Sequence, residues 1–159
     1  MDPHSRAIQI LYICKKKEII LFTNIPFFLN SQKVENALVE FSSLYGFTID
    51  KLSYNFVSKE TLLEMNRQYL KHDTHTDIIS FDYTSDKSLT AEFFISIWAV
   101  AQSAEEEAQS IENETLRVIS HGILHCMGKN DKNKAEQMEM RKLEEEFITL
   151  FHVKHKNHV

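Results

Sequence analysis

The segment between Leu116 and Gly128 constrains this chain more than any other, because it combines a helical pattern with residues that can bind a metal. Its apolar residues recur at the spacing of one helix face, which predicts a helix packed against a core. These residues are Leu116, Ile119, Ile123 and Met127. His121 and His125 stand at positions i and i+4, so their side chains share one face with Cβ atoms about 6 Å apart. Each imidazole can then reach a shared ion at about 2.1 Å.

A third ligand is expected shortly after this helix. Gly128 can end the helix and let the chain turn back, and Asp131 follows in the returning loop. A carboxylate is a suitable zinc ligand, so the sequence predicts a metal site formed by His121, His125 and Asp131. Three protein ligands leave one position open for water, as in catalytic zinc sites.

Gly122 lies between the two histidines, where a glycine costs a helix about 1 kcal/mol relative to alanine. Its presence indicates a close approach of backbone, metal or substrate, and tight helix packing is the alternative explanation.

The two histidines also match the first half of a zincin metalloprotease motif, which requires a glutamate after the first histidine as general base. Gly122 occupies that position, which argues against a peptidase.

The rest of the sequence alternates between segments typical of strands and segments typical of helices. Strands are predicted at 8–14 and 18–23, as a hairpin, and at 47–57, 77–83 and 93–98. Helices are predicted from a Ser31 cap to a stop at Gly46, after a Ser58 cap, from the end of the last strand to Ser110, and from an Asn133 cap to about His152. This order predicts an α+β fold in which a small mixed β-sheet packs against several helices.

The composition limits the possible functions. A chain of 159 residues with 43% hydrophobic residues can bury one core, so we predict a single domain over residues 1–159 with a flexible tail from about residue 153. Its longest apolar run is interrupted by polar residues and proline, which argues against a membrane span or an export signal. Two widely separated cysteines fit a cytoplasmic protein. The net charge of −5 argues against nucleic-acid binding by bulk charge, so RNA contacts must be local.

Two sequence blocks resemble the YbeY family. That family carries H-G-x-L-H-x-x-G, then two residues and a third ligand, and the chain has this pattern from His121 to Gly128. Asp131 stands where most members have a third histidine. A second family block has Asn-x-x-Tyr at a helix end, then a loop and T-D-[VI]-[LI]-[ST]-F. The chain matches this block at Asn66, Tyr69, Thr76, Asp77, Ile78, Ile79, Ser80 and Phe81.

The resemblance implies a zinc-dependent, single-strand-specific endoribonuclease that acts in maturation of the 3′ end of small-subunit ribosomal RNA and in ribosome quality control. Its cofactor is then one zinc ion, or another divalent transition metal, at His121, His125 and Asp131. Its partners are ribosomal RNA, the small ribosomal subunit and ribosome-associated proteins. Asp77 or His75 is a candidate for orienting water or a ligand. Capping of backbone amides is the alternative role for Asp77.

The chain departs from the family pattern at two places. Many members carry an arginine after the tyrosine of the second block, and Leu70 takes its place here. Arg67 or Lys71 is therefore a candidate to supply the missing cation to a substrate phosphate, and Ser80 is a third candidate for substrate contact. The family's usual Gly-Asp before a strand is Ala91-Glu92 in this chain.

Two other functions stay open at this point. One is a metal-dependent hydrolase with a non-RNA substrate, because a three-ligand site is chemically generic and a fold does not determine a substrate. The other is a noncatalytic ribosome-assembly factor with a structural metal. Leu70 and the lack of an assigned general base favour this second alternative.

Overall fold

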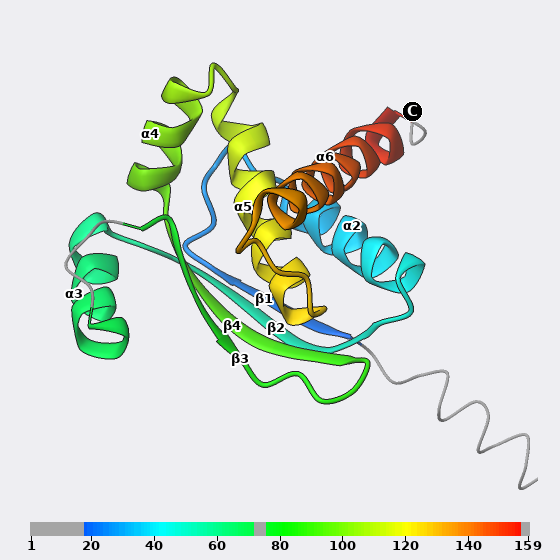
Figure 1. The fold of residues 1–159 in the computed structure, drawn as a ribbon. Coiled ribbons are helices and arrows are strands. Elements are labelled where there is room, and N and C mark those ends of the chain that lie inside the picture. Colours follow the sequence, from blue (N-terminus) through cyan, green and yellow to red (C-terminus); the bar gives the residue numbers. More distant parts are fainter. Residues whose placement is uncertain (1–17, 72–75, 157–159) are drawn as a thin grey trace, which may run out of the picture.

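The structure is a computed structural model that describes residues 18–71 and 76–156 of the chain, with side chains up to Val153 in the last helix. The described residues form four strands and five helices (Figure 1). The predicted strand at 8–14, and with it the predicted hairpin, lies outside the described residues, as does His75.

The four strands form one sheet in the order β1-β2-β4-β3. They are β1 (Ile19–Thr23), β2 (Thr48–Val57), β3 (Ile78–Asp82) and β4 (Ser88–Ser96). β2 runs parallel to both β1 and β4, whereas β3 pairs with β4 in the antiparallel direction. The predicted small mixed sheet is therefore confirmed. Alternate residues of β4 are buried on one face, as the strand period of two requires; they are Leu89, Ala91, Phe93 and Ile95.

Local hydrogen bonds explain where the helices begin and end. The helices are α2 (Ser31–Leu44), α3 (Lys59–Leu70), α4 (Ile97–Glu106), α5 (Ile111–Cys126) and α6 (Lys134–Lys156). Ser58 caps α3 as predicted, because its hydroxyl accepts a hydrogen bond from the Thr61 amide. At the start of α6, Asn133 Oδ1 accepts from the Glu136 amide, also as predicted. Gly46 follows α2 with φ at +79°, a conformation that favours glycine.

Three predicted helix boundaries were wrong. α4 ends at Glu106 and not at Ser110, whose hydroxyl accepts a hydrogen bond from the Asn113 amide and caps α5. The cap of α2 is Asn30, whose side chain accepts a hydrogen bond from the Lys33 amide, so Ser31 is the first helical residue. Both residue types are good caps, and the extended backbone of Asn30 decides between them. The last helix continues to Lys156, beyond its predicted end near His152.

The predicted strand at 93–98 was also wrong at both ends. β4 begins earlier, at Ser88, because its polar first half pairs with β2. It ends at Ser96, whose hydroxyl accepts a hydrogen bond from the Ala99 amide and so starts α4. Ile97 and Trp98 have the composition of a strand, but this cap places them in a helix.

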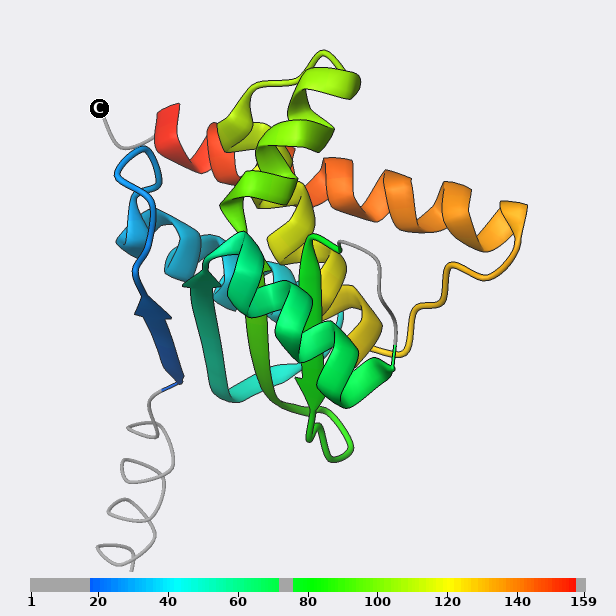
Figure 2. The ribbon, with the colours of Figure 1, turned by 90° about the vertical axis from the view of Figure 1, so that its left-hand side faces the viewer.

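The sheet separates two layers of helices (Figures 1 and 2). α3 covers one face, where Tyr69 packs edge to face on Phe81 of β3. α2 and α5 cover the other face, and α6 packs against both of them. The main core lies between the sheet and these three helices, and its fully buried members include Phe41, Phe93 and Phe147. This arrangement confirms the predicted single-domain α+β fold. Within the described residues, no helix combines the length and apolarity that a bilayer crossing requires.

α5 is the central helix of this core. Every residue from Glu114 to Cys126 is buried except His121 and His125. Gly122 faces the sheet, and a Cβ atom at this position would lie 2.8 Å from Cε1 of Phe93, with a further close contact to Ile78. Tight packing of the helix on the sheet is therefore the reason for the glycine, which was the alternative explanation from the sequence.

We expect Gly122→Ala to destabilise the protein. The added methyl group meets Phe93, which is fully buried and stacked on Tyr54 with ring centroids 4.7 Å apart. Overpacking of this kind costs about 1–3 kcal/mol, against a gain of about 1 kcal/mol from the helix preference of alanine. The free energy of unfolding in denaturant measures the net loss. Adding Phe93→Leu should give a double mutant that loses less than the sum of the single losses. Additive losses would contradict the contact.

Candidate metal centre

Two of the three predicted ligands come from one face of α5. The side chains of His121 and His125 are partly exposed, and their Nε2 atoms lie 3.0 Å apart. Their rings meet edge to face, with centroids 4.5 Å apart. The i, i+4 spacing thus brings one ring nitrogen of each histidine to the same point.

The third predicted ligand reaches this point from the loop between α5 and α6. Gly128 adopts φ at +89°, and its amide donates to the carbonyl oxygen of His125, so the chain reverses at the end of α5. Asp131 then places Oδ2 3.4 Å from Nε2 of each histidine. Gln137 of α6 holds the loop in place, because its Nε2 donates to the Asp131 carbonyl oxygen at 3.1 Å.

The three ligand atoms have the spacing that a small tetrahedral ion needs. Their separations are 3.0, 3.4 and 3.4 Å. In a tetrahedral zinc site with bonds of about 2.0–2.1 Å, neighbouring ligand atoms are roughly 3.3–3.4 Å apart. Two imidazoles and a carboxylate also suit zinc and several other divalent transition metals. The residues present therefore fit the metal that the sequence implies.

Glu144 of α6 contacts His121 at Nδ1, the ring nitrogen that does not face the other two candidate ligands. Its Oε2 lies 2.7 Å from Nδ1 of His121, and its side chain is 6% exposed. An ionised carboxylate can only accept hydrogen bonds, so His121 Nδ1 carries the proton and is the donor of the hydrogen bond to Glu144. The lone pair of Nε2 is then directed toward the other two ligands, as in many zinc sites.

Sequence reasoning missed Glu144, because it lies on another helix. A signal was present, since Glu144 interrupts the buried apolar face of α6. The neighbouring members of that face are Met140, Leu143, Phe147, Ile148 and Phe151. An acidic residue at such a position requires a buried partner.

Arg117 extends this set of charges into the core. Its Nη1 lies 3.5 Å from Glu144 Oε1, its Nε lies 3.4 Å from Glu114 Oε2, and it also pairs with Glu145. Except for Glu145, these side chains are almost completely buried. Buried charges persist only when they are paired. Arg117 therefore pairs with Glu144 and, through it, fixes the ring orientation of His121.

The charges around His121 attract protons as well as metal ions. Burial by itself lowers the pKa of His121, but the hydrogen bond and charge of Glu144, together with Asp131 and Asp77, outweigh burial and raise it above 6.5. A proton and a metal ion compete for the same Nε2 lone pair. Acid would therefore weaken the binding of a metal at this site.

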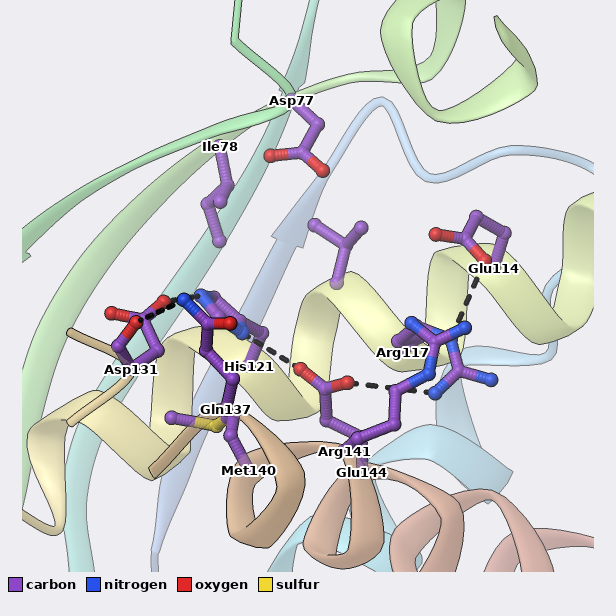
Figure 3. Close-up of a pocket in the computed structure, with 11 residues that line it drawn as sticks. Asp77, Ile78, Glu114, Arg117, His121, Asp131, Gln137, Met140, Arg141 and Glu144 are labelled. Atoms are coloured by element: carbon purple, nitrogen blue, oxygen red, sulfur yellow. Dashed lines mark hydrogen bonds and ion pairs between the residues drawn. The ribbon is translucent and has the colours of Figure 1, made fainter. Parts of the chain in front are cut away.

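A cavity of about 320 Å³ opens beside the ligands, between α5, α6 and the start of β3 (Figure 3). His121 and Asp131 lie at one end and Glu114 at the other, and Asp77 projects into it from the strand side. Burial raises the pKa of Asp77 above 3.8, although the charge of His121 opposes this shift. The carboxylate also accepts hydrogen bonds from the backbone amides of Asp77 and Ile78. The Asp77 carboxylate thus both faces the cavity and caps the backbone amides at the start of β3.

The predicted substrate contacts do not line this cavity. Arg67 belongs to α3, and Lys71 ends that helix, on the opposite face of the sheet (Figure 2). Ser80 is exposed on β3. Their roles in substrate binding stay predictions. Arg141 of α6 does line the cavity, and the sequence analysis did not identify it, because nothing local distinguishes it from other surface cations on that helix.

The chain is similar in sequence and in fold to known proteins. The family model described as Endoribonuclease YbeY matches residues 23–152. A protein named Endoribonuclease YbeY from Phocaeicola vulgatus is 41% identical over 111 residues, which cover 70% of this chain and 80% of that protein. A protein of the same name from Christiangramia forsetii is 40% identical over 144 residues, which cover 87% of this chain and 98% of that protein. A solution structure from Thermotoga maritima matches with a TM-score of 0.66 and 20% identity over 88% of this chain and 93% of that one, which supports the fold.

We expect the untagged protein to bind about one zinc ion per chain, and His121→Ala or His125→Ala to abolish this binding, because each change removes one of three ligands. Asp131→Ala should weaken binding for the same reason. Elemental analysis after dialysis against metal-free buffer measures the bound metal. His152→Ala is the matched control, since this helical histidine bonds to Asn113 at 2.8 Å and lies outside the cavity. Retention of the ion in His121→Ala would contradict the site.

We also expect Glu144→Gln to weaken zinc binding by about 10- to 100-fold, because an uncharged amide neither orients His121 as strictly nor increases its basicity. Competition with a chromophoric chelator measures the affinity. Glu145→Gln is the control, because Glu145 pairs with the same Arg117 but is largely exposed and does not contact His121. If both variants lose affinity equally, the effect comes from the pairing of Arg117 and not from the bond to His121.

Proposed function

The chain belongs to the YbeY endoribonuclease family, and from this premise we propose that it is a zinc-dependent endoribonuclease specific for single-stranded RNA. It acts in maturation of the 3′ end of small-subunit ribosomal RNA and in ribosome quality control. Its partners are ribosomal RNA, the small ribosomal subunit and ribosome-associated proteins, and its location is the cytoplasm.

One observation carries the proposal: in a member of this family, three ligand atoms lie 3.0–3.4 Å apart, and two of the residues that carry them, His121 and Asp131, line a cavity of about 320 Å³. Structural zinc sites usually have four protein ligands, whereas catalytic sites have three and keep one position open. Among the described residues, this group of ligands contains His121, His125 and Asp131 and no fourth member. That count favours a catalytic metal over a structural one.

The residues around the cavity suggest a division of roles. A bound zinc ion lowers the pKa of water toward neutrality and polarises a phosphoryl oxygen, which are the two requirements of phosphodiester hydrolysis. Asp77 is placed to accept the proton of the attacking water on its carboxylate, because it projects into the cavity and its pKa is raised by burial. Glu144 keeps the proton of His121 on Nδ1 throughout.

Arg141 is the cation best placed to attract the substrate phosphate. It lines the cavity, and its guanidinium pairs with Glu107 at 3.3 Å on the surface. Exposed pairs of this kind contribute little to stability, so a phosphate can replace Glu107 at low cost. Arg67, Lys71 and Ser80 remain candidates for contacts with more distant nucleotides.

The shape of the site supports a preference for single strands. The ligands lie in the wall of a cavity between two helices and a strand, so the phosphate that is cut has to enter the cavity. A single strand can bend its backbone to do this. An A-form duplex holds its phosphates along a stiff helical path.

The test is cleavage of a single-stranded RNA that spans the 3′ end of the small-subunit ribosomal RNA precursor, beside a duplex of the same sequence. We expect the untagged protein to cut the single strand, to lose this activity with a chelator and in His121→Ala, and to regain it with zinc. Asp77→Asn should slow cleavage by about 100-fold or more without loss of metal, since a general base typically contributes that much. Asp86→Asn, in the exposed β3–β4 turn, is the matched control.

Each other outcome has a defined meaning. Bound metal without cleavage would favour the noncatalytic assembly factor, and cofractionation with small ribosomal subunits would support that function. Cleavage of other phosphodiesters or esters, but not of RNA, would favour a hydrolase with a different substrate. The absence of metal from every sample would contradict the site itself.

A further inference from the structure

Asp77 also lines a second cavity, of about 450 Å³, which the metal chemistry does not use. Its other walls come mainly from one side of α4, along the length of this helix, and include Trp98, Gln102, Ser103 and Glu106. We call this cavity the Trp98 groove. Because Asp77 belongs to both cavities, the Trp98 groove adjoins the metal centre.

Backbone contacts tie the Trp98 groove to the metal cavity. The amide of Ser96 donates to the Asp77 carbonyl oxygen at 3.0 Å. The Ser96 side chain in turn accepts from the Ala99 amide at 3.2 Å and caps α4. The first turn of α4, which carries Trp98, is therefore anchored directly to the residue that faces the metal ligands.

An aromatic ring and a cation lie together at this groove. Trp98 is 41% exposed, which is unusual for the largest apolar side chain. The ammonium of Lys59, at the start of α3, lies over the indole ring, 4.4 Å from its centroid. Proteins that bind single-stranded nucleic acids combine these two elements, with bases stacked on aromatic rings and phosphates attracted by nearby cations.

The charges of the groove favour a base over a phosphate. Asp77 and Glu106 are both acidic, so they repel a phosphate inside the groove. Their carboxylates can accept hydrogen bonds from the amino groups of a base, and the amide of Gln102 and the hydroxyl of Ser103 can donate or accept. Lys59 holds its ammonium over the indole ring and does not line the groove, so a base stacks on the part of the ring that faces the groove and the phosphate that follows it lies toward Lys59.

We propose that the Trp98 groove binds a nucleobase of single-stranded RNA, stacked on Trp98, next to the nucleotide whose phosphate enters the metal cavity. This subsite rests on the proposed function, because it serves the same RNA strand. It gives an acidic protein a way to hold RNA without a large basic surface, since stacking does not depend on net charge.

Trp98 is the one tryptophan in the chain, so its fluorescence reports directly on this groove. The zinc-loaded protein is titrated with a short single-stranded 2′-O-methyl phosphorothioate RNA, which resists cleavage, and with the same backbone lacking its bases. We expect saturable quenching by the first oligonucleotide and not by the abasic one. Cleavage of unmodified single-stranded RNA is measured in parallel.

Variants test the same point without fluorescence. We expect Trp98→Leu to raise the Kd for a dye-labelled oligonucleotide by about 10-fold and to lower kcat/KM by a similar factor, while Trp98→Phe keeps most of the binding. Phe27→Leu is the matched control, because Phe27 is a fully exposed aromatic residue outside the groove, and its Kd should not change. Unchanged metal content in Trp98→Leu shows that the site has stayed folded.

The results separate this proposal from the proposed function. If the wild-type protein cleaves RNA but shows no base-dependent quenching, or if Trp98→Leu binds and cleaves as the wild type does, the subsite is wrong and the nuclease stands. If the wild-type protein neither binds nor cleaves single-stranded RNA, both are overturned.

Discussion

The contact between Gly122 of α5 and Phe93 of β4 sets how closely the central helix lies against the sheet. α5 is buried along most of its length, so it cannot rotate or shift without opening the core. His121 and His125, the two residues between Glu114 and Cys126 that are not buried, therefore project from a rigid element at a defined edge. A metal site needs such rigidity, because ligand atoms have to be held within about 0.5 Å of their working positions.

The buried charges beside α5 link the stability of the protein to its site. Glu144 pairs with Arg117 on one side and accepts a hydrogen bond from His121 Nδ1 on the other. Removing one partner of a buried pair typically costs about 3–5 kcal/mol, whereas a well-packed apolar replacement is often no less stable. Packing alone thus does not explain these charges. Their arrangement is explained by the need to keep one tautomer and one ring orientation at the metal centre.

The acidic character of the molecule explains how RNA recognition has to work here. Asp77, Glu114 and Glu144 border the metal cavity, and the whole chain carries a net charge of −5. Without an ion, these carboxylates repel a phosphate, so a divalent cation changes the sign of the interaction as well as supplying the chemistry. In the proposed function, the remaining affinity comes from local contacts such as Arg141 and a base stacked on Trp98, because a net charge of −5 does not attract RNA over long distances.

Local sequence patterns specified the α+β class, the starts of α3 and α6 and the histidine pair, because caps and the i, i+4 spacing involve residues within one or two turns. Errors occurred where local preferences compete, as at the start of α4, where a serine cap outweighs strand-like composition. His121 and His125 share a face in any helix that contains them. Asp131 follows the second histidine by six residues, so its place as third ligand could also be predicted from the spacing. In contrast, the support of His121 by Glu144 and the exposure of Asp77 to the cavity depend on how α6 and β3 pack against α5. Those contacts join residues far apart in the chain, and only the packed core specifies them.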